Sequence, residues 1–309
     1  MKQRGKHELW SNAIQYKGIL MLALPGLLLL VAFSYLPMIG IVIPFKKIDY
    51  SKGILGSAWV GLTNFKFLFA SGDVWRATRN TLVQNALLIS TTLVVSLSLA
   101  LVLYELSARR VKAYMTALFV PYFLSWVVVG YVAYTFLNPS MGIINQILRM
   151  LGQNGRVNWY VEPKRWRAVL TIAYLWKNVG YFTILYYASL MGIDSGYFEA
   201  ASIDGASKLQ QIFRISIPLL SPVVIMLTLL QIGKIFFSDF GLFYFVPKNS
   251  GALYAVTDVI DTYVFRSLQT SPNLGMTAAA GLCQTAAGFI LVMATNAIVR
   301  RLDAERALF

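Results

Sequence analysis

A polar run in the second half of the chain carries residue types that could form a docking element between two apolar segments. It reads Glu199-Ala200-Ala201-Ser202-Ile203-Asp204-Gly205 and is followed ten residues later by Ile215-Ser216-Ile217-Pro218. Asp194 or Ser195 can cap a helix that carries the Glu199 carboxylate in its first turn. Gly205 interrupts this helix, and Pro218 redirects a second helical stretch, begun at 208–213, into the next apolar segment. We expect a short amphipathic helix in a polar docking loop.

Other polar side chains lie inside the apolar segments, where they are costly and mark candidate transport pathways. They are Tyr174, Lys177, Asn178 and Tyr181 and, in a later segment, Gln231 and Lys234. Tyr174, Lys177 and Tyr181 share one helical face by their i, i+3, i+7 spacing. Sugars are bound by such mixtures, because aromatic rings stack on a pyranose and polar groups bond its hydroxyls. In the structural alternative, Lys234 pairs with Asp239 and Lys177 donates to a backbone carbonyl.

The composition of the chain is typical of a membrane protein. Of the 309 residues 57% are apolar and 14% aromatic, and the mean hydropathy is +0.62, more than a soluble domain carries. Six apolar stretches can cross about 30 Å of hydrocarbon. We expect all-α spans near 18–43, 80–104, 112–137, 168–191, 217–238 and 274–299, within one transmembrane domain over 18–300, with a loop over 192–216 between the fourth and fifth spans.

The basic residues suggest which way the chain crosses the membrane. Six crossings put both termini on one side, and short basic segments precede the first span, fill the second connection (Arg109, Arg110 and Lys112) and follow the last span. The positive-inside tendency makes these segments, including 1–17 and 301–309, cytoplasmic. Anionic lipid headgroups would compensate these basic residues, which account for the formal charge of +14. We therefore exclude nucleic acid as a partner.

The spacing within the polar run resembles the signature of binding-protein-dependent ABC importer permeases. That signature is Glu-Ala-Ala, three residues, Gly, nine residues, Ile, one residue and Leu-Pro, and this chain departs from it only at Ile217, where Leu is usual. Further motifs are similar to the carbohydrate-uptake, maltose-type branch, and most resemble its first permease subunit. They are Pro25-Gly26-Leu27-Leu28, Val60-Gly61-Leu62-Thr63-Asn64-Phe65 and Asn80-Thr81.

This resemblance implies a type I permease fold, a location in the bacterial or archaeal cell membrane and a set of partners. These are a related second permease, two ATPase subunits that bind ATP and Mg²⁺, and an extracytoplasmic solute-binding protein. The helix near Glu199 would be a coupling helix in a cleft of an ATPase subunit. Ala200 and Ala201 would allow close approach, Glu199 would offer a carboxylate and Gly205 would give the turn. The resemblance assigns the docking role to Glu199, Ala200, Ala201, Asp204, Gly205, Ile215 and Pro218.

Other function classes fit less well. The chain has no Gly-x-x-x-x-Gly-Lys-Ser/Thr loop, so ATP hydrolysis is expected from another polypeptide and no cofactor from this one. One histidine and one cysteine exclude a His-based metal cluster and an internal disulfide, and supply no enzyme site. Ion-coupled transport would need intramembrane carboxylates, which are nearly absent. If both Lys177 and Lys234 face the cavity, an acidic, uronate-containing oligosaccharide is favoured; a non-sugar solute is the alternative.

Overall fold

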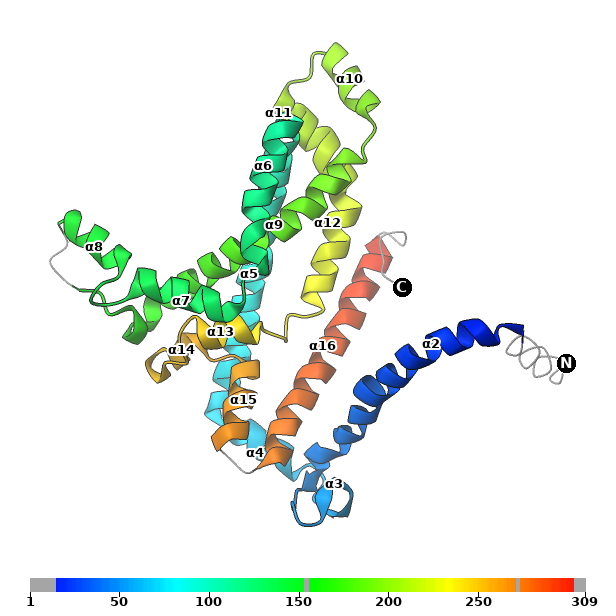
Figure 1. Cartoon of the computed structure of the whole chain (residues 1–309), viewed down its shortest axis with the longest axis vertical. Helices are drawn as coiled ribbons and strands as arrows, with labels where there is room; N and C mark the ends of the chain where they lie inside the picture. Colours follow the sequence, from blue (N-terminus) through cyan, green and yellow to red (C-terminus); the bar gives the residue numbers. More distant parts are fainter. Residues whose placement is uncertain (1–14, 153–155, 271–272, 303–309) are drawn as a thin grey trace.

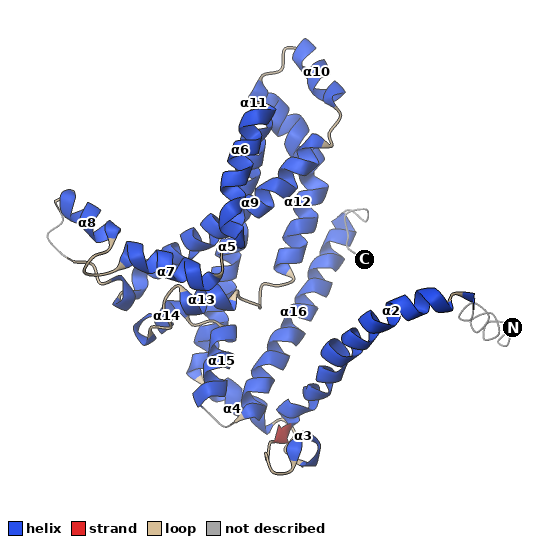
Figure 2. Cartoon of the chain, in the orientation of Figure 1, coloured by secondary structure: helices blue, strands red, loops and turns tan. Residues whose placement is uncertain are grey.

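The computed structural model describes residues 15–152, 156–270 and 273–302, and most of these residues lie in helices (Figure 2). Two short strands, β1 (Lys46–Lys47) and β2 (Ala58–Trp59), pair antiparallel. The α-helices are α2 (Lys17–Leu30), α3 (Gly53–Gly56), α4 (Thr63–Ala70), α5 (Gly72–Tyr104), α6 (Ala108–Phe119), α7 (Trp126–Leu137), α8 (Ile143–Met150), α9 (Trp166–Met191), α10 (Ser195–Ile203), α11 (Lys208–Gln211), α12 (Ile217–Ile232), α13 (Phe240–Phe245), α14 (Tyr254–Thr257), α15 (Ile260–Thr270) and α16 (Leu274–Leu302).

Segments of other helix types join these elements. π-helical turns are η1 (Val31–Tyr35) and η6 (Ile212–Ser216), and 3₁₀ segments are η2 (Leu36–Phe45), η3 (Val120–Phe123), η4 (Trp159–Val161), η5 (Pro163–Arg165) and η7 (Gly251–Leu253). Segment η6 makes α11 and α12 one helical stretch. Pro218 lies inside this stretch, just after the π-helical turn, where such irregular turns accompany a proline in a helix.

Among the described residues, five helical stretches are long and apolar enough to cross a membrane. They are Lys17–Phe45, Gly72–Tyr104, Pro163–Met191, Lys208–Ile232 and Leu274–Arg301. These stretches coincide with five of the six expected spans, with two differences in extent. Helix α5 begins at Gly72 rather than near residue 80, and α12 ends at Ile232, so residues 233–238 of the expected fifth span lie outside that helix.

The segment expected as the third span, 112–137, is two helices rather than one. The stretches Ala108–Phe123 and Trp126–Leu137 meet at a bend of 102°, and they count as a sixth span only if taken together. Pro121 lies at the start of η3 and has no N–H to donate to the preceding turn. Ser125 then caps α7 by accepting from the Val128 N–H at 3.4 Å. The periodic apolar pattern runs through this break, which explains why a single span was expected.

Helices α5 and α9 form the centre of the fold and lie against each other along much of their length. Leu88 of α5 packs in a buried cluster with Trp166 and Leu170 of α9 and with Leu242 of α13. Gly180 of α9 lies against the Leu118 carbonyl of α6, where a Cβ atom would overlap the backbone. Small residues of this kind let membrane helices approach closely.

Helix α2 stands apart from this bundle. Figure 1 shows it extending away from the other helices, and no side chain of α2 is buried by the described part of the chain. Its continuation η2 packs against α16. Figure 1 also shows α10 at one end of the molecule, with the β1–β2 hairpin segment and α4 at the opposite end.

Candidate functional site

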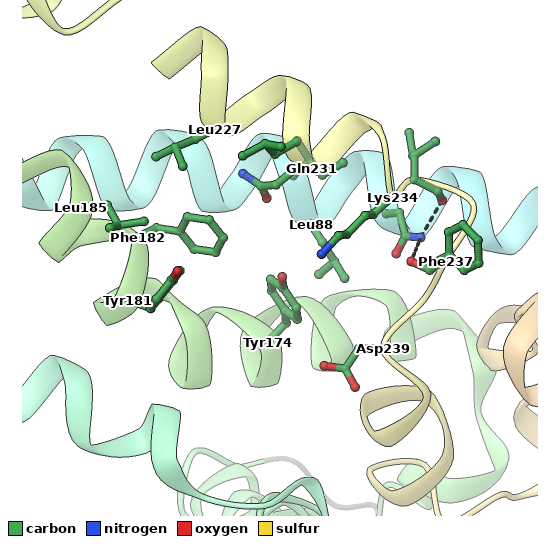
Figure 3. A pocket seen from close by; sticks show the side chains of 14 residues that line it. Leu88, Tyr174, Tyr181, Phe182, Leu185, Leu227, Gln231, Lys234, Phe237 and Asp239 are labelled. Atoms are coloured by element: carbon green, nitrogen blue, oxygen red, sulfur yellow. Dashed lines mark hydrogen bonds between the residues drawn. The ribbon is translucent and has the colours of Figure 1, made fainter. Parts of the chain in front are cut away.

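A cavity of about 360 Å³ lies between α5, α9 and the segment formed by α12 and the residues that follow it (Figure 3). We call it the central cavity. Its lining residues are Asn85, Leu88 and Ile89 of α5, Tyr174, Tyr181, Phe182 and Leu185 of α9, and Leu227, Leu230, Gln231, Lys234, Ile235, Phe237 and Asp239. The lining combines aromatic and aliphatic faces with amide, ammonium and carboxylate groups, as in sites that bind small polar molecules.

Four of the six expected pathway residues line the central cavity together. Tyr174 and Tyr181, seven residues apart on α9, face Gln231 and Lys234 across it (Figure 3). Lys234 is exposed, and in the described part of the chain no carboxylate oxygen lies within 4 Å of its Nζ atom. The expected alternative, an ion pair between Lys234 and Asp239, is therefore wrong. The cavity presents a cation that forms no direct ion pair with a described carboxylate, beside two tyrosine rings.

The cavity owes its shape to the irregular backbone after α12. Asn85 of α5 donates to the carbonyls of Ile235 and Phe237 at 2.7 and 3.1 Å. Gln284 of α16 donates to the Phe236 carbonyl at 2.6 Å, and the Ser238 N–H donates to the Asp261 carboxylate at 2.8 Å. Non-helical backbone at membrane depth persists only where such partners satisfy it or where it lines a cavity. These side chains therefore hold Lys234 and Asp239 in place.

Asp239 is held at one end of the central cavity. One carboxylate oxygen accepts from the Gly241 N–H at 3.1 Å and so caps α13, and the other accepts from the Trp126 indole N–H at 2.6 Å. Both oxygens are thus engaged with groups of α13 and α7. Asp239 therefore connects α7 to the lining of the central cavity. Its negative charge and the Lys234 ammonium both face this cavity.

Lys177 and Asn178 do not line the central cavity. The buried Lys177 side chain donates from Nζ to the Tyr122 carbonyl at 2.6 Å and lies over the Tyr122 and Trp126 rings at 5.2 and 5.5 Å. Asn178 donates to the Tyr174 carbonyl of its own helix at 3.0 Å. The expectation that Lys177 faces the cavity is therefore corrected in favour of its structural alternative. The helix break frees the Tyr122 carbonyl, and Lys177 is the donor that satisfies it.

Sequence reasoning missed the contribution of α5 to this site. The buried polar residues Asn80, Thr81, Gln84 and Asn85 recur at helical spacing along an otherwise apolar helix. Such a stripe signals a polar interior face, because lipid cannot satisfy these groups. The stripe could have identified Asn85. The partners of Asn85 lie about 150 residues away in the chain, and nothing in the local pattern indicates them.

The second candidate site is the loop that contains α10. The Asp194 side chain caps α10 by accepting from the Gly196 N–H at 2.9 Å, as expected. At the other end Gly205 has a φ of +78°, while the Ala206 and Gly205 N–H groups donate to Ala201 and Ser202 at 2.9 and 3.1 Å. These two bonds form a Schellman motif, which favours glycine at the left-handed position. Gly205 is therefore the turn that ends α10.

Side-chain contacts fix this loop to the end of α5. Ser207 and Gln210 form a capping box at the start of α11, and the buried Gln211 amide donates to the Ser202 hydroxyl at 3.0 Å. Lys208 pairs with Glu105 at 2.9 Å. The rings of Phe198 and Tyr104 lie 5.6 Å apart. The loop is consequently a formed structure before any partner binds.

The expected docking residues occupy different parts of this loop. Glu199, Ala200, Asp204 and Gly205 are exposed on or next to α10, and Ala201 is half-buried. Glu199 accepts from the Ser195 hydroxyl at 3.2 Å, one turn earlier in the helix. Ile215 lies in the π-helical turn and Pro218 in the first turn of α12, so both shape the return to the bundle. Large apolar side chains are exposed beside them, namely Tyr197, Ile203, Leu209 and Phe213.

Comparison with known proteins gives three consistent results. The family model described as "Binding-protein-dependent transport system inner membrane component" matches residues 74–304. The chain is 31% identical over 305 residues to the polygalacturonan/rhamnogalacturonan transport system permease protein YteP of Bacillus subtilis (strain 168), covering 98% of this chain and 94% of that protein. It is also 32% identical over 209 residues to the sn-glycerol-3-phosphate transport system permease protein UgpA of Yersinia enterocolitica, covering 67% of this chain and 68% of UgpA.

A solved structure shares the fold over nearly the whole chain. The crystal structure of a bacterial ABC transporter involved in the import of the acidic polysaccharide alginate contains a chain with a TM-score of 0.87 and 30% sequence identity. The match covers 96% of this chain and 99% of that chain. A second alginate transporter structure, in complex with an alginate pentasaccharide-bound periplasmic protein, gives a TM-score of 0.85 at 29% identity, covering 95% and 98%.

Proposed function

Because this chain belongs to the binding-protein-dependent transport system inner membrane component family, we propose that it forms half of the translocation path of an importer for acidic, uronate-containing oligosaccharides. The observation that carries the proposal is the Lys234 ammonium, which pairs directly with no described carboxylate and lies beside Tyr174 and Tyr181 in the central cavity. A sugar carboxylate would pair with Lys234, and pyranose rings would stack on the tyrosines. Two relatives support an acidic cargo, since the YteP system is named for polygalacturonan and the matching transporter structure for alginate.

The partners follow from the family and from the exposed loop. We place α10 in a cleft of one of two ATPase subunits, where Glu199 would meet a basic group and Ala200 and Ala201 would allow close contact. ATP and Mg²⁺ would be bound by those subunits and no cofactor by this chain. A related second permease would supply the other half of the path, and an extracytoplasmic solute-binding protein would deliver the cargo. Both termini would then be cytoplasmic.

The cargo proposal is tested by uptake into liposomes that contain the complete importer. We expect Lys234→Gln to reduce uptake of a galacturonate trisaccharide about tenfold, equivalent to about 1.4 kcal/mol, because the carboxylate loses the one cation among the described residues that line the central cavity. Uptake of a neutral trisaccharide, if measurable, should change less than twofold. Lys66→Gln, at an exposed lysine outside the cavity, is the matched control.

Two results would contradict this function. In one, Lys234→Gln leaves galacturonate uptake intact. In the other, the unmodified importer prefers a neutral sugar or sn-glycerol 3-phosphate, the solute in the name of the UgpA relative, over the galacturonate trisaccharide. A preference for sn-glycerol 3-phosphate would support the non-sugar alternative, because a phosphate ester would also be attracted by Lys234.

A further inference from the structure

A second hollow, separate from the central cavity, lies between α7 and the turn that follows α13. Its volume is about 440 Å³, and we call it the tyrosine cleft. Its lining residues are Val127, Gly130, Tyr131, Tyr134, Tyr244, Phe245, Lys248 and Asn249. Gly130 forms the close contact between the two elements, since a Cβ atom there would lie 2.8 Å from the Phe245 carbonyl oxygen. Three tyrosines, one lysine and one asparagine therefore face a single recess.

Lys248 is the only ammonium group of this lining. Its Nζ atom lies 3.8 Å from the centroid of the Tyr134 ring, and no carboxylate of the described residues lies within 4 Å of it. The nearby Arg266 is different, because it pairs with the buried Asp258 carboxylate. A cation over an aromatic ring that lacks an anionic partner can accept one from a ligand. The charge at the cleft is therefore available to an anion.

The backbone holds Lys248 in an unusual conformation. Lys248 and Asn249 have φ values of +56° and +47°, and they are the two described non-glycine residues with positive φ. The turn is fixed by the Asn249 N–H, which donates to the Tyr244 carbonyl at 2.9 Å, and by the Tyr254 hydroxyl, which donates to the Asn249 side chain at 2.9 Å. Residues kept in this sparsely populated region concentrate at binding sites, where the surroundings impose the conformation.

The tyrosine cleft lies close to the central cavity. The two hollows are separated by α13, whose first turn is capped by Asp239 of the cavity and whose last residues, Tyr244 and Phe245, line the cleft. Six helical residues span about 9 Å, a distance that a short oligosaccharide can bridge. The turn at Lys248 also lies between the expected fifth and sixth spans, so a cytoplasmic N-terminus would place it outside the cell. The cleft and the cavity thus lie at opposite ends of α13.

We propose that the tyrosine cleft is a second binding site for acidic saccharides, with Lys248 pairing with a sugar carboxylate and Tyr131, Tyr134 and Tyr244 offering rings to the pyranose faces. This proposal rests on the proposed function, since it takes the same cargo. Its role would be to receive one end of the chain of sugars before Lys234 engages the cargo in the central cavity. The binding energy would come from the charge pair and from ring stacking together.

The test is equilibrium binding of a labelled galacturonate trisaccharide to the purified complex of the two permeases and the ATPase subunits in neutral-lipid nanodiscs, without ATP and without the solute-binding protein. We expect two binding phases. Lys248→Met should weaken one of them about tenfold, Lys248→Arg should retain it, and Lys234→Gln should weaken the other phase. Lys164→Met, at an exposed lysine between the expected third and fourth spans, should alter neither phase. Neutral maltotriose should bind identically to the unmodified protein and to Lys248→Met.

The outcomes separate this inference from the function on which it rests. If the unmodified importer binds no galacturonate trisaccharide, both are overturned. If Lys234→Gln abolishes all binding and Lys248→Met changes nothing, only the cleft is overturned. The cleft is also overturned if Lys248→Met only weakens docking of the solute-binding protein. The cleft proposal is overturned as well if phosphatidylglycerol binds in the cleft and no saccharide-binding phase depends on Lys248. The cleft would then be a lipid site.

Discussion

Two lysines within the apolar part of the chain have opposite roles, although the sequence presents them alike. Lys234 lies exposed in the central cavity, whereas Lys177 is buried against the Tyr122 carbonyl and two aromatic rings. A hydrogen bond from a charged donor to a carbonyl is stronger than one from a neutral donor. Aromatic rings that exclude water stabilise the ammonium further through cation–π attraction. Lys177 is therefore a positioning residue for the break between η3 and α7, and Lys234 is the candidate cargo contact.

Substitution of Lys177 should affect stability rather than cargo selection. Lys177→Met leaves the Tyr122 carbonyl without its donor, which costs about 1–3 kcal/mol. We expect a lower thermal midpoint for the purified importer in detergent, while the apparent affinity for a galacturonate trisaccharide stays within about threefold of the original. Lys177→Arg should restore most of the midpoint. A tenfold loss of affinity with an unchanged midpoint would instead make Lys177 a cargo ligand.

Helix capping in the α10 loop was predictable because its signals are local. Asp194, Gly205 and the break before Lys208 follow from propensities that act over a few residues, and the structure has each of them. The bend after Phe123 and the irregular segment after Ile232 were not predictable in the same way. They depend on donors supplied by Lys177, Asn85 and Gln284 from other helices. Proline and glycine near these breaks permit them but do not specify their angle.

At the scale of this element, Gly205 offers a direct test of coupling. Gly205→Val places a branched side chain at φ +78°, which costs about 1–2 kcal/mol or more and opposes the Schellman motif that ends α10. We expect uptake to fall at least tenfold and co-purification of the ATPase subunits to weaken, with the protein still inserted. Gly192→Ala is the matched control, because Gly192 belongs to the same loop and has an ordinary φ of −84°. Normal uptake by Gly205→Val would refute the coupling role.

At the scale of the whole molecule, the fold suggests an incomplete unit. Helix α2 buries no side chain in the described chain, and its exposed residues are almost entirely apolar. The central cavity is lined by α5, α9 and the segment that contains α12. These elements would form one side of the translocation path. Sequence reasoning predicted the approximate positions of five of its six expected spans from their length and hydropathy, and the third is the bent helix pair. It could not predict that α2 lies apart, because hydropathy does not distinguish a lipid-facing surface from one covered by another polypeptide.

The arrangement also makes a prediction about sidedness. Helices α5 and α16 both run away from the β1–β2 hairpin end, so α10 and the end of α16 are expected on the same face of the membrane (Figure 1). The basic residues at 109–112 and 300–301 favour the cytoplasm for that face. In a Cys283→Ser background, we expect Lys52→Cys, next to the hairpin, to react with a membrane-impermeant maleimide in intact cells.

Cysteines at the other end should behave in the opposite way. Leu209→Cys and Arg301→Cys occupy exposed positions after α10 and near the end of α16, so they should react only after the membrane is permeabilised. Cys283→Ser alone is the control for background labelling. Because the reaction reports exposure on one side and not transport, it remains informative if a variant is inactive. Labelling of Leu209→Cys in intact cells would invert the orientation and place α10 beyond the reach of any cytoplasmic ATPase.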